Sequence, residues 1–386
     1  MSDSQQHNDV LGLPRRRVVL AGVGSAVSLG LAGCIGSRFV PGADLSESDL
    51  SGQTISNEDL SGADLTGANL AEATLSNVEL AEATLTDATL TGAELTNVGL
   101  AEATLDGADL SGATLSTVDL EAASLAGVEL SDSTLTDVEL LTADLSDAVA
   151  AAADFETVGL IEATLSGAVL SEATLFDVEL AEATLTDAIL TEAELTNVGL
   201  AEATLDGADI SGATLTTVDL EAASLAGVEL SDSSLTDVEL LTADLSDVVA
   251  VAADFQTVEL ADATLSGAVL SEGTIDDSDF GHARMTDADL SGVTLSDSEL
   301  NGADLSNGGL PNAEVTDSVF ADTTLQAADL TGASFTAVDL KGADLRDATV
   351  EEATFTESGL SDADLSGATW TDGSSCGSES CDGRAY

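Results

Sequence analysis

Every fifth residue of the chain is apolar over most of its length. From Leu45 to Trp370 this register holds for 66 consecutive positions, here called centres, and most of them are Leu, with Ile, Val, Phe, Met, Ala and one Trp as variants. An amphipathic helix repeats its apolar positions every 3.6 residues, and a strand repeats them every 2 residues. A period of five therefore predicts a coil in which each pentapeptide turns one side chain inward at the same point.

The residue two positions before each centre is also small. It is usually Ala or Val, as in Ala63 before Leu65 and Ala303 before Leu305. The other three positions of the unit are mostly Asp, Glu, Ser, Thr, Asn and Gly, which suit solvent and turns. We therefore expect the centre and the small residue to point inward and the other three residues to point outward.

Units of this composition resemble the pentapeptide-repeat family, whose repeat is written A(D/N)LXX. The resemblance covers residues 43–372 and implies an all-β fold, a right-handed quadrilateral β-helix with four pentapeptides in each coil. At roughly 4.8 Å per coil, about 16 coils would form a rod about 80 Å long. Four units per coil also follow from the chain itself, because Val takes the small position every 20 residues, at Val78, Val98, Val118, Val138, Val158, Val178, Val198, Val218, Val238 and Val258.

The chain also contains a longer internal repeat, of 100 residues, that keeps the register of the pentapeptides. Residues 71–170 match residues 171–270 nearly one for one, an offset of five whole coils. Repeat rods tolerate such growth because each coil contacts only its neighbours. The two smallest centres, Ala150 and Ala250, are each followed by a Phe centre, which predicts that volume is compensated within the coil.

The first 33 residues predict an export signal. Arg15-Arg16-Arg17 precedes an uncharged apolar run that is short for a membrane span. The Arg pair resembles the twin-arginine export motif, although Pro14 replaces its usual Ser or Thr. Leu31-Ala32-Gly33-Cys34 resembles a lipobox, which implies lipidation of Cys34 and a short tether over 34–42. We therefore expect an exported protein, anchored by membrane lipid at the outer face of the cell membrane; a generic signal with a lone Cys is the alternative.

The net charge of −64 narrows the class of partner. The chain has 72 acidic residues against 8 basic ones, and Lys341 is its one Lys. Nucleic-acid binding needs many Lys and Arg to displace counterions, so we expect none. Molar salt shortens the screening length to roughly 3 Å and weakens self-repulsion. The composition resembles that of haloarchaeal proteins; an acidic functional surface is the alternative reading.

Candidate catalytic chemistry is sparse. The two His, His7 and His282, lie in the signal region and in the rod, so they are not expected to act together. No phosphate-binding loop, zinc spacing or cofactor fingerprint occurs, and we expect neither an enzyme nor a bound cofactor or metal. Cys376 and Cys381 lie in a Gly/Ser-rich tail over 373–386, where an exported chain can keep a disulfide. A two-Cys metal site is the alternative for that pair.

One outward position is repeatedly apolar and predicts a contact surface. The residue after the centre on the Val face is often Ala, and it is larger at Leu141, Ile161 and Leu241. Phe176 is also predicted to point outward. Apolar strips on a charged surface often mark binding sites, although most members here are Ala and could be incidental. This strip would bind a protein partner or a second copy.

Two functional classes remain open. The first is a non-catalytic, lipid-anchored surface rod that binds a partner or acts as a spacer in high salt. The second follows from the resemblance, since some pentapeptide-repeat proteins are acidic rods that mimic DNA and bind type II topoisomerases in the cytoplasm. The export signal favours the first class. The centres predict one continuous rod without α-helix over 43–370.

Overall fold

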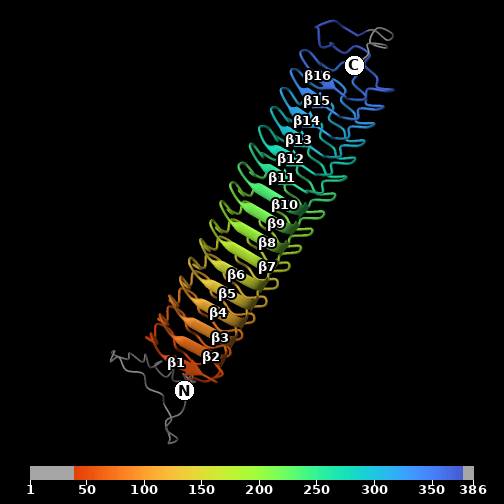
Figure 1. Cartoon of the computed structure of the whole chain (residues 1–386). Coiled ribbons are helices and arrows are strands. Elements are labelled where there is room, and N and C mark those ends of the chain that lie inside the picture. The colour runs from red at the N-terminus through yellow and green to blue at the C-terminus, as the bar shows by residue number, and fades with distance from the viewer. Residues whose placement is uncertain (1–38, 377–386) are drawn as a thin grey trace, which may run out of the picture.

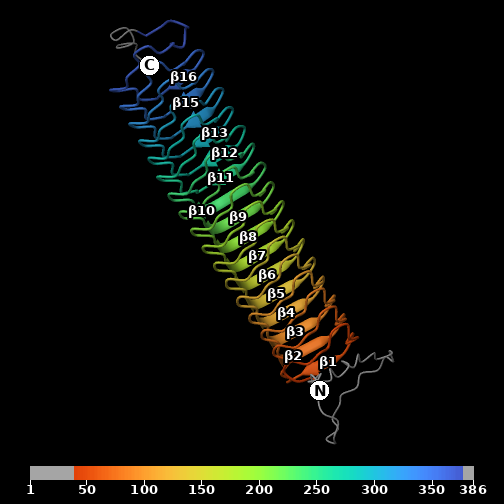
Figure 2. The same cartoon turned by 180° about the vertical axis from the view of Figure 1, so that it is seen from behind.

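The computed structural model describes residues 39–376, which wind into one long rod with the first and last described residues at its opposite tips (Figure 1). These residues contain no α-helix. Seen from behind, the coils stack with the same regular spacing over the whole length (Figure 2). The fold class predicted from the period of five is therefore confirmed.

One strand per coil builds a single parallel sheet along the rod. The sheet has 16 strands in sequence order, from β1 to β16. Nine strands have six residues and the others have three. They are β1 (Thr54–Ser56), β2 (Thr74–Glu79), β3 (Glu94–Gly99), β4 (Thr114–Asp119), β5 (Thr134–Glu139), β6 (Asp154–Gly159), β7 (Thr174–Glu179), β8 (Glu194–Gly199), β9 (Thr214–Asp219), β10 (Ser234–Glu239), β11 (Asp254–Gln256), β12 (Thr274–Asp276), β13 (Thr294–Ser296), β14 (Glu314–Thr316), β15 (Ser334–Thr336) and β16 (Thr354–Thr356).

Residues 20 apart lie side by side in successive coils. Leu75 pairs with Leu95 in the sheet, and parallel bridges join the same positions on the remaining sides. Each coil thus has four bridged sides, as the Val spacing predicted. In the coil that contains β2, side A holds the strand, side B the bridge at Glu79, side C the bridge at Thr84 and side D the bridge at Thr89.

The centres fill the interior of the rod. Every centre from Leu45 to Val350 is buried, as are the Ala and Val residues two positions before most of them. Removing a Leu side chain from water stabilises the fold by roughly 1.5–3 kcal/mol. Ala150 and Phe155 are successive centres, on side D of one coil and side A of the next, and both are buried.

The corners depend on one special backbone position in each pentapeptide. From Gly42 to Gly367, every residue two positions after a centre has a positive φ. Only Gly adopts this left-handed region freely, and Asn and Asp tolerate it best among the others. At one such corner, Ala83 donates from its N–H to the carbonyl of Leu80 (3.0 Å), while Leu80 donates to Gly99 in the next coil (2.6 Å). The ladder between coils therefore holds each strained corner.

The two ends of the described coil differ from the expected boundaries. At the N-terminal end, Val40 already occupies the centre register and Gly42 donates to the carbonyl of Ser61 (2.8 Å), so part of the expected tether belongs to the coil. At the C-terminal end, Trp370 is buried and stacks on Phe355 with ring centroids 5.9 Å apart. The backbone N–H of Cys376 donates to Ala368 (2.7 Å), which folds residues 371–376 back and closes the rod.

Candidate functional surfaces

Side chains that can meet a ligand lie in outward columns along the rod. Because the coil repeats every 20 residues, each outward position forms a column with one residue in every coil. The interior is filled by the centres. A ligand or partner can therefore bind the rod on its four outer sides and at its corners.

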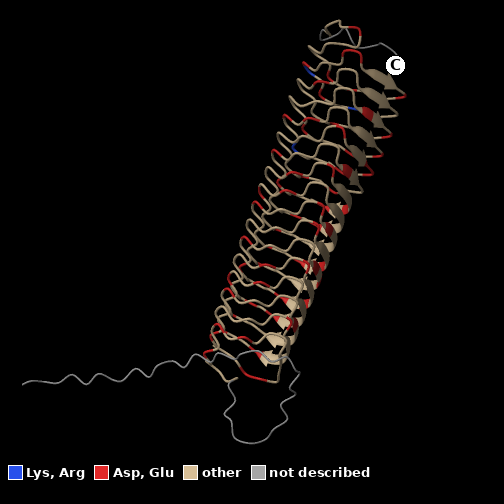
Figure 3. Ribbon diagram, turned by 90° about the vertical axis from the view of Figure 1, so that its left-hand side faces the viewer, with Lys and Arg blue, Asp and Glu red and all other residues tan. Residues whose placement is uncertain are grey.

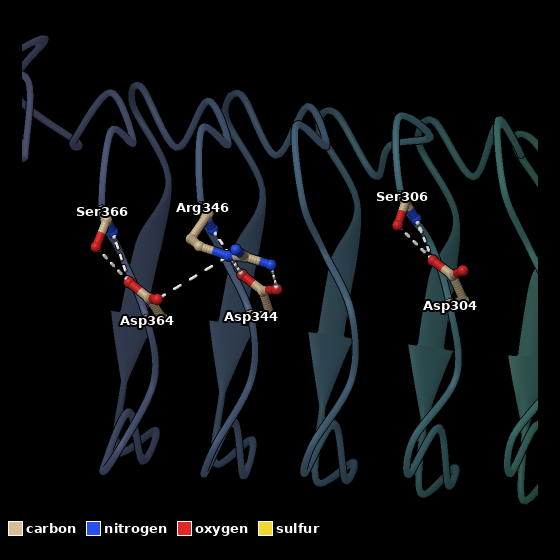
Figure 4. Close-up of polar contacts among 6 residues, drawn as sticks. All are labelled: Asp304, Ser306, Asp344, Arg346, Asp364 and Ser366. Atoms are coloured by element: carbon tan, nitrogen blue, oxygen red, sulfur yellow. Dashed lines mark hydrogen bonds and ion pairs between the residues drawn. The ribbon is translucent and has the colours of Figure 1, made fainter.

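Many outward Asp residues are engaged in shaping the corners. The Asp before a centre accepts a hydrogen bond from the backbone N–H of the residue after that centre, as in Asp304 with Ser306 (3.0 Å) and Asp364 with Ser366 (3.0 Å) (Figure 4). The hydroxyl of each Ser donates to the same carboxylate oxygen. In Asp364 these hydrogen bonds, the hydroxyl first and the N–H second, hold the pKa of the carboxyl below its usual value.

Arg346 replaces Ser in one copy of this corner. Its guanidinium donates twice to Asp344, from Nε at 2.7 Å and from Nη2 at 2.5 Å (Figure 4). The hydrogen bond from Arg346 is the main cause of the lowered pKa of Asp344. A second carboxylate, that of Asp364, lies 4.0 Å from Nε in the next coil. This corner carries a surface ion pair, which stabilises the fold by less than about 1 kcal/mol.

The predicted apolar strip separates into two places. Leu141 and Ile161 occupy one column at the corner between sides B and C, where Thr142 donates to the carbonyl of Ile161 (3.0 Å). Both side chains are half-buried. Leu241 lies in the same column five coils further along, beyond Glu221. Phe176 is 43 % exposed but follows the centre of β7, at the opposite edge of side B, so it does not extend this column.

Side D carries a second apolar column, which was not predicted from the sequence. Val149, Val169 and Ile189 are bridged in successive coils, and Ile189 is 38 % exposed. Val249 and Val269 repeat the column five coils later. The signal that could have found it is the residue directly before the centre, read every 20 residues. The predicted strip was defined by the residue directly after the centre, which lies on another column.

The repeated unit decides the family. A family model for pentapeptide repeats matches residues 43–149, 153–249 and 275–369 in overlapping copies. The chain belongs to the pentapeptide-repeat family. A comparison with curated proteins found no match.

Several solved pentapeptide-repeat proteins are similar to the chain. HetL, involved in heterocyst differentiation regulation in the cyanobacterium Nostoc sp. strain PCC 7120, is 25% identical over 85% of this chain and 91% of its own, with a TM-score of 0.12. A pentapeptide-repeat protein of the Arabidopsis thaliana thylakoid lumen is 29% identical over 30% of this chain and 74% of its own, with a TM-score of 0.19. Trypsin-treated QnrB1, a plasmid-mediated fluoroquinolone resistance protein, is 17% identical over 45% and 85%, with a TM-score of 0.36.

Charge is distributed unevenly along this pentapeptide-repeat rod. Asp and Glu occur from end to end, whereas the described Lys and Arg lie in its C-terminal part (Figure 3). The three are Arg284, Lys341 and Arg346, and the sequence has neither Lys nor Arg from residue 39 to residue 283. The N-terminal two thirds of the rod therefore carry acidic side chains with no Lys or Arg among them.

The remaining predicted site residues fall into two groups. The first group lies outside the described residues and comprises Arg15, Arg16, Leu31, Ala32, Gly33, Cys34 and Cys381. Cys376 is buried and disulfide-bonded, and its pairing with Cys381 stays a prediction.

His282 stands at a corner with φ of 59°, where its ring covers Gly302 of the next coil. In residues 39–376 no three His, Cys, Asp or Glu side chains are grouped as metal ligands. Within the same residues, no helix long and apolar enough to cross a membrane is found.

Proposed function

We propose that the protein is a non-catalytic, lipid-anchored rod at the outer face of the cell, where it binds a partner or holds it at a distance in high salt. The observation that carries this proposal is the filled interior. Every centre from Leu45 to Val350 is buried, so binding falls to the outward columns. A rod of about 16 coils at roughly 4.8 Å each would extend about 80 Å from its anchor.

The anchor rests on the order of motifs at the start of the chain. A basic region with Arg15 and Arg16, an apolar run and Leu31-Ala32-Gly33-Cys34 follow one another as in an exported lipoprotein. The described coil begins close to Cys34, because Gly42 already bonds to the next coil. The N-terminal tip of the rod would then stand near the membrane, with the capped tip at Trp370 pointing away.

The high-salt environment is supported by the charge of the rod. Between residues 39 and 283 the chain offers acidic side chains and no Lys or Arg. At physiological salt, charges within about 8 Å repel one another appreciably, whereas molar salt reduces that range to roughly 3 Å. We expect the rod to gain stability as salt rises.

Cell fractionation of a Cys34→Ser variant tests the anchor. The wild-type chain should be found with membranes and should be accessible to protease on intact cells. The variant should appear in the medium or remain as an uncleaved precursor. A variant that stays membrane-bound at the mature size would refute lipid anchoring at Cys34, and a wild-type chain confined to the cytoplasm would refute export.

The DNA-mimic class is the alternative, supported by family membership and by the anionic surface. Duplex DNA carries about one negative charge per 1.7 Å of its axis. A rod densely covered with carboxylates could therefore occupy the surface with which another protein binds DNA. The test is inhibition of a type II topoisomerase by the purified rod at physiological salt. Inhibition together with a cytoplasmic location would replace the surface-rod proposal.

A further inference from the structure

Side D carries an ordered succession of apolar and acidic residues. Its bridged column reads Val149, Val169, Ile189, then Asp209 and Glu229, then Val249 and Val269. Each residue is bridged in register to the next one, so the succession forms one continuous column along side D. Glu229 and Ile189 are exposed, and the other five are half-buried.

Acidic residues line both edges of the apolar part of this column. At the corner between sides C and D stand Asp147 and Asp187, and at the corner between sides D and A stand Glu172 and Glu192. All four residues are exposed. An apolar surface bordered on both sides by carboxylates complements a partner whose apolar stripe is bordered by Lys or Arg. A second copy offers no such partner surface over 39–283, where Lys and Arg do not occur.

The spacing of the column fits an α-helix that lies along the rod. The first and third apolar residues are two coil steps apart, about 10 Å, and two helical turns cover about 11 Å. The six steps from Val149 to Val269 cover about 29 Å, which corresponds to roughly 19 helical residues. An extended strand fits less well, because its side chains on one face repeat at about 6.6 Å.

We propose that side D between Val149 and Val269 is a docking site for one amphipathic, cationic helix of a partner protein. The terminal turns of that helix place apolar side chains on Val149, Val169 and Ile189 at one end and on Val249 and Val269 at the other. Its central turns place Lys or Arg against Asp209 and Glu229. This inference rests on the proposed binding role, and it names the partner's chemistry.

Synthetic 20-residue helical peptides test this site on the full chain. The first peptide has an apolar stripe in its end turns and Lys in its central turns. The second has the same composition with the stripe in the centre and Lys at the ends, and the third has Glu for every Lys. Fluorescence anisotropy in 2 M NaCl measures Kd, because high salt suppresses attraction that depends on net charge alone.

The first peptide should bind at least tenfold more tightly than the second and the third. Val169→Asp with Ile189→Asp should reduce its affinity to that of the second peptide. The charge-matched control Leu141→Asp with Ile161→Asp, at the corner between sides B and C, should leave Kd within about twofold. Circular dichroism and thermal unfolding should show that both variants keep the fold, since each change is at the surface.

Equal binding of the first two peptides would overturn the proposal, and so would unchanged binding by the double variant. Analytical ultracentrifugation of the chain alone tests whether a second copy occupies side D instead. Self-association that the double variant abolishes would assign side D to a second copy and overturn the proposal. These outcomes are independent of Cys34. A chain that is not anchored, but that binds the first peptide more tightly than the second and the third, would refute the surface location and support the docking site.

Discussion

The coils from β2 to β10 and the coils from β11 to β16 share one core register but turn differently from side A to side B. In the first region the strands continue through the corner and have six residues. In the second region they stop after three. The centres are buried in both regions as far as Val350, so the difference does not arise from the packing of Leu.

The small inward residue before side B explains the difference. A six-residue strand occurs where this residue is Val both in its own coil and in the next coil, and β10 with Val238 and Val258 is the last case. Beyond it, this position is taken by Ser278, Ser298, Ser318, Val338 and Ser358, and the N–H of Val338 donates to the Ser358 hydroxyl of the next coil. Val is β-branched and favours extended backbone, whereas a Ser hydroxyl competes for backbone hydrogen bonds and favours turns.

The Ser hydroxyls act across the coil boundary. Each accepts from a backbone N–H of the preceding coil: Val258 donates to Ser278, Ser278 to Ser298, and Ser298 to Ser318, at 3.1–3.2 Å. Because the acceptor belongs to the next coil, the strand before Val258, β11, stops at Gln256 although the residue at this position is Val. Corner geometry in this rod is therefore set jointly by two successive coils.

The largest expected effect tests what the two regions share. Leu205→Asp and Leu305→Asp each place an unpaired charge in the filled interior, where both Leu residues are buried. Each should lower the free energy of unfolding by several kcal/mol, by similar amounts in the two regions. Denaturant unfolding in high salt measures this loss. A structure in which either Leu is exposed, or a variant as stable as wild type, would contradict the shared core.

A smaller effect is expected when a hydroxyl is introduced into the long-strand region. Val158→Ser should cost about 2 kcal/mol through lost apolar burial. It should also shorten β5 and β6, because the new hydroxyl can accept from the N–H of Val138. Val158→Ala is the matched control, since it loses bulk without offering an acceptor. A crystal structure of each variant decides the point, and six-residue strands retained with Ser would contradict the proposed cause.

The reverse change should be smaller still. Ser298→Ala removes the acceptor of the Ser278 N–H, and an unpaired buried N–H costs about 1–2 kcal/mol. Replacing Ser278, Ser298 and Ser318 together by Val should recover this loss, because the strand can then continue through the corner. Ser296→Ala, on the outward face of the same coil, removes a hydrogen bond from its hydroxyl to Asp276 but leaves no buried N–H unpaired, and should cost less than about 1 kcal/mol. Greater instability of the triple Val variant than of Ser298→Ala would show that Val does not set the corner.

The sequence was sufficient for the fold because one short period repeats for most of the chain. The register also marked Trp370 as its last centre, and the structure places this side chain, buried, at the closed end of the rod. The two corner types were not predicted, because Val and Ser were both treated as small inward residues. Their difference lies in a hydrogen bond to the neighbouring coil, which is not visible within one pentapeptide. Phe176 and Leu141 were grouped by their distance from a centre, although they stand on different corners.

The smallest expected effect concerns the Asp–Ser corner that recurs near both ends of the rod. In Asp59 and in Asp364, hydrogen bonds from the Ser two residues on, the hydroxyl first, lower the pKa of the carboxyl. A folded pKa below the unfolded value of about 3.9 means that the stabilisation is present at neutral pH. It is lost as pH falls through the folded pKa, below about 4.

Ser61→Ala and Ser366→Ala should therefore raise the pKa of Asp59 and Asp364 toward the ordinary value, and the Ala variants should lose less stability on acidification. Carboxyl NMR titration measures the pKa of each Asp directly. Molar salt should leave both shifts largely in place, because a hydrogen bond at contact distance is screened less than attraction between separated charges. If salt alone abolished the shift in wild type, the general field of the rod, rather than the Ser hydroxyl, would be its cause.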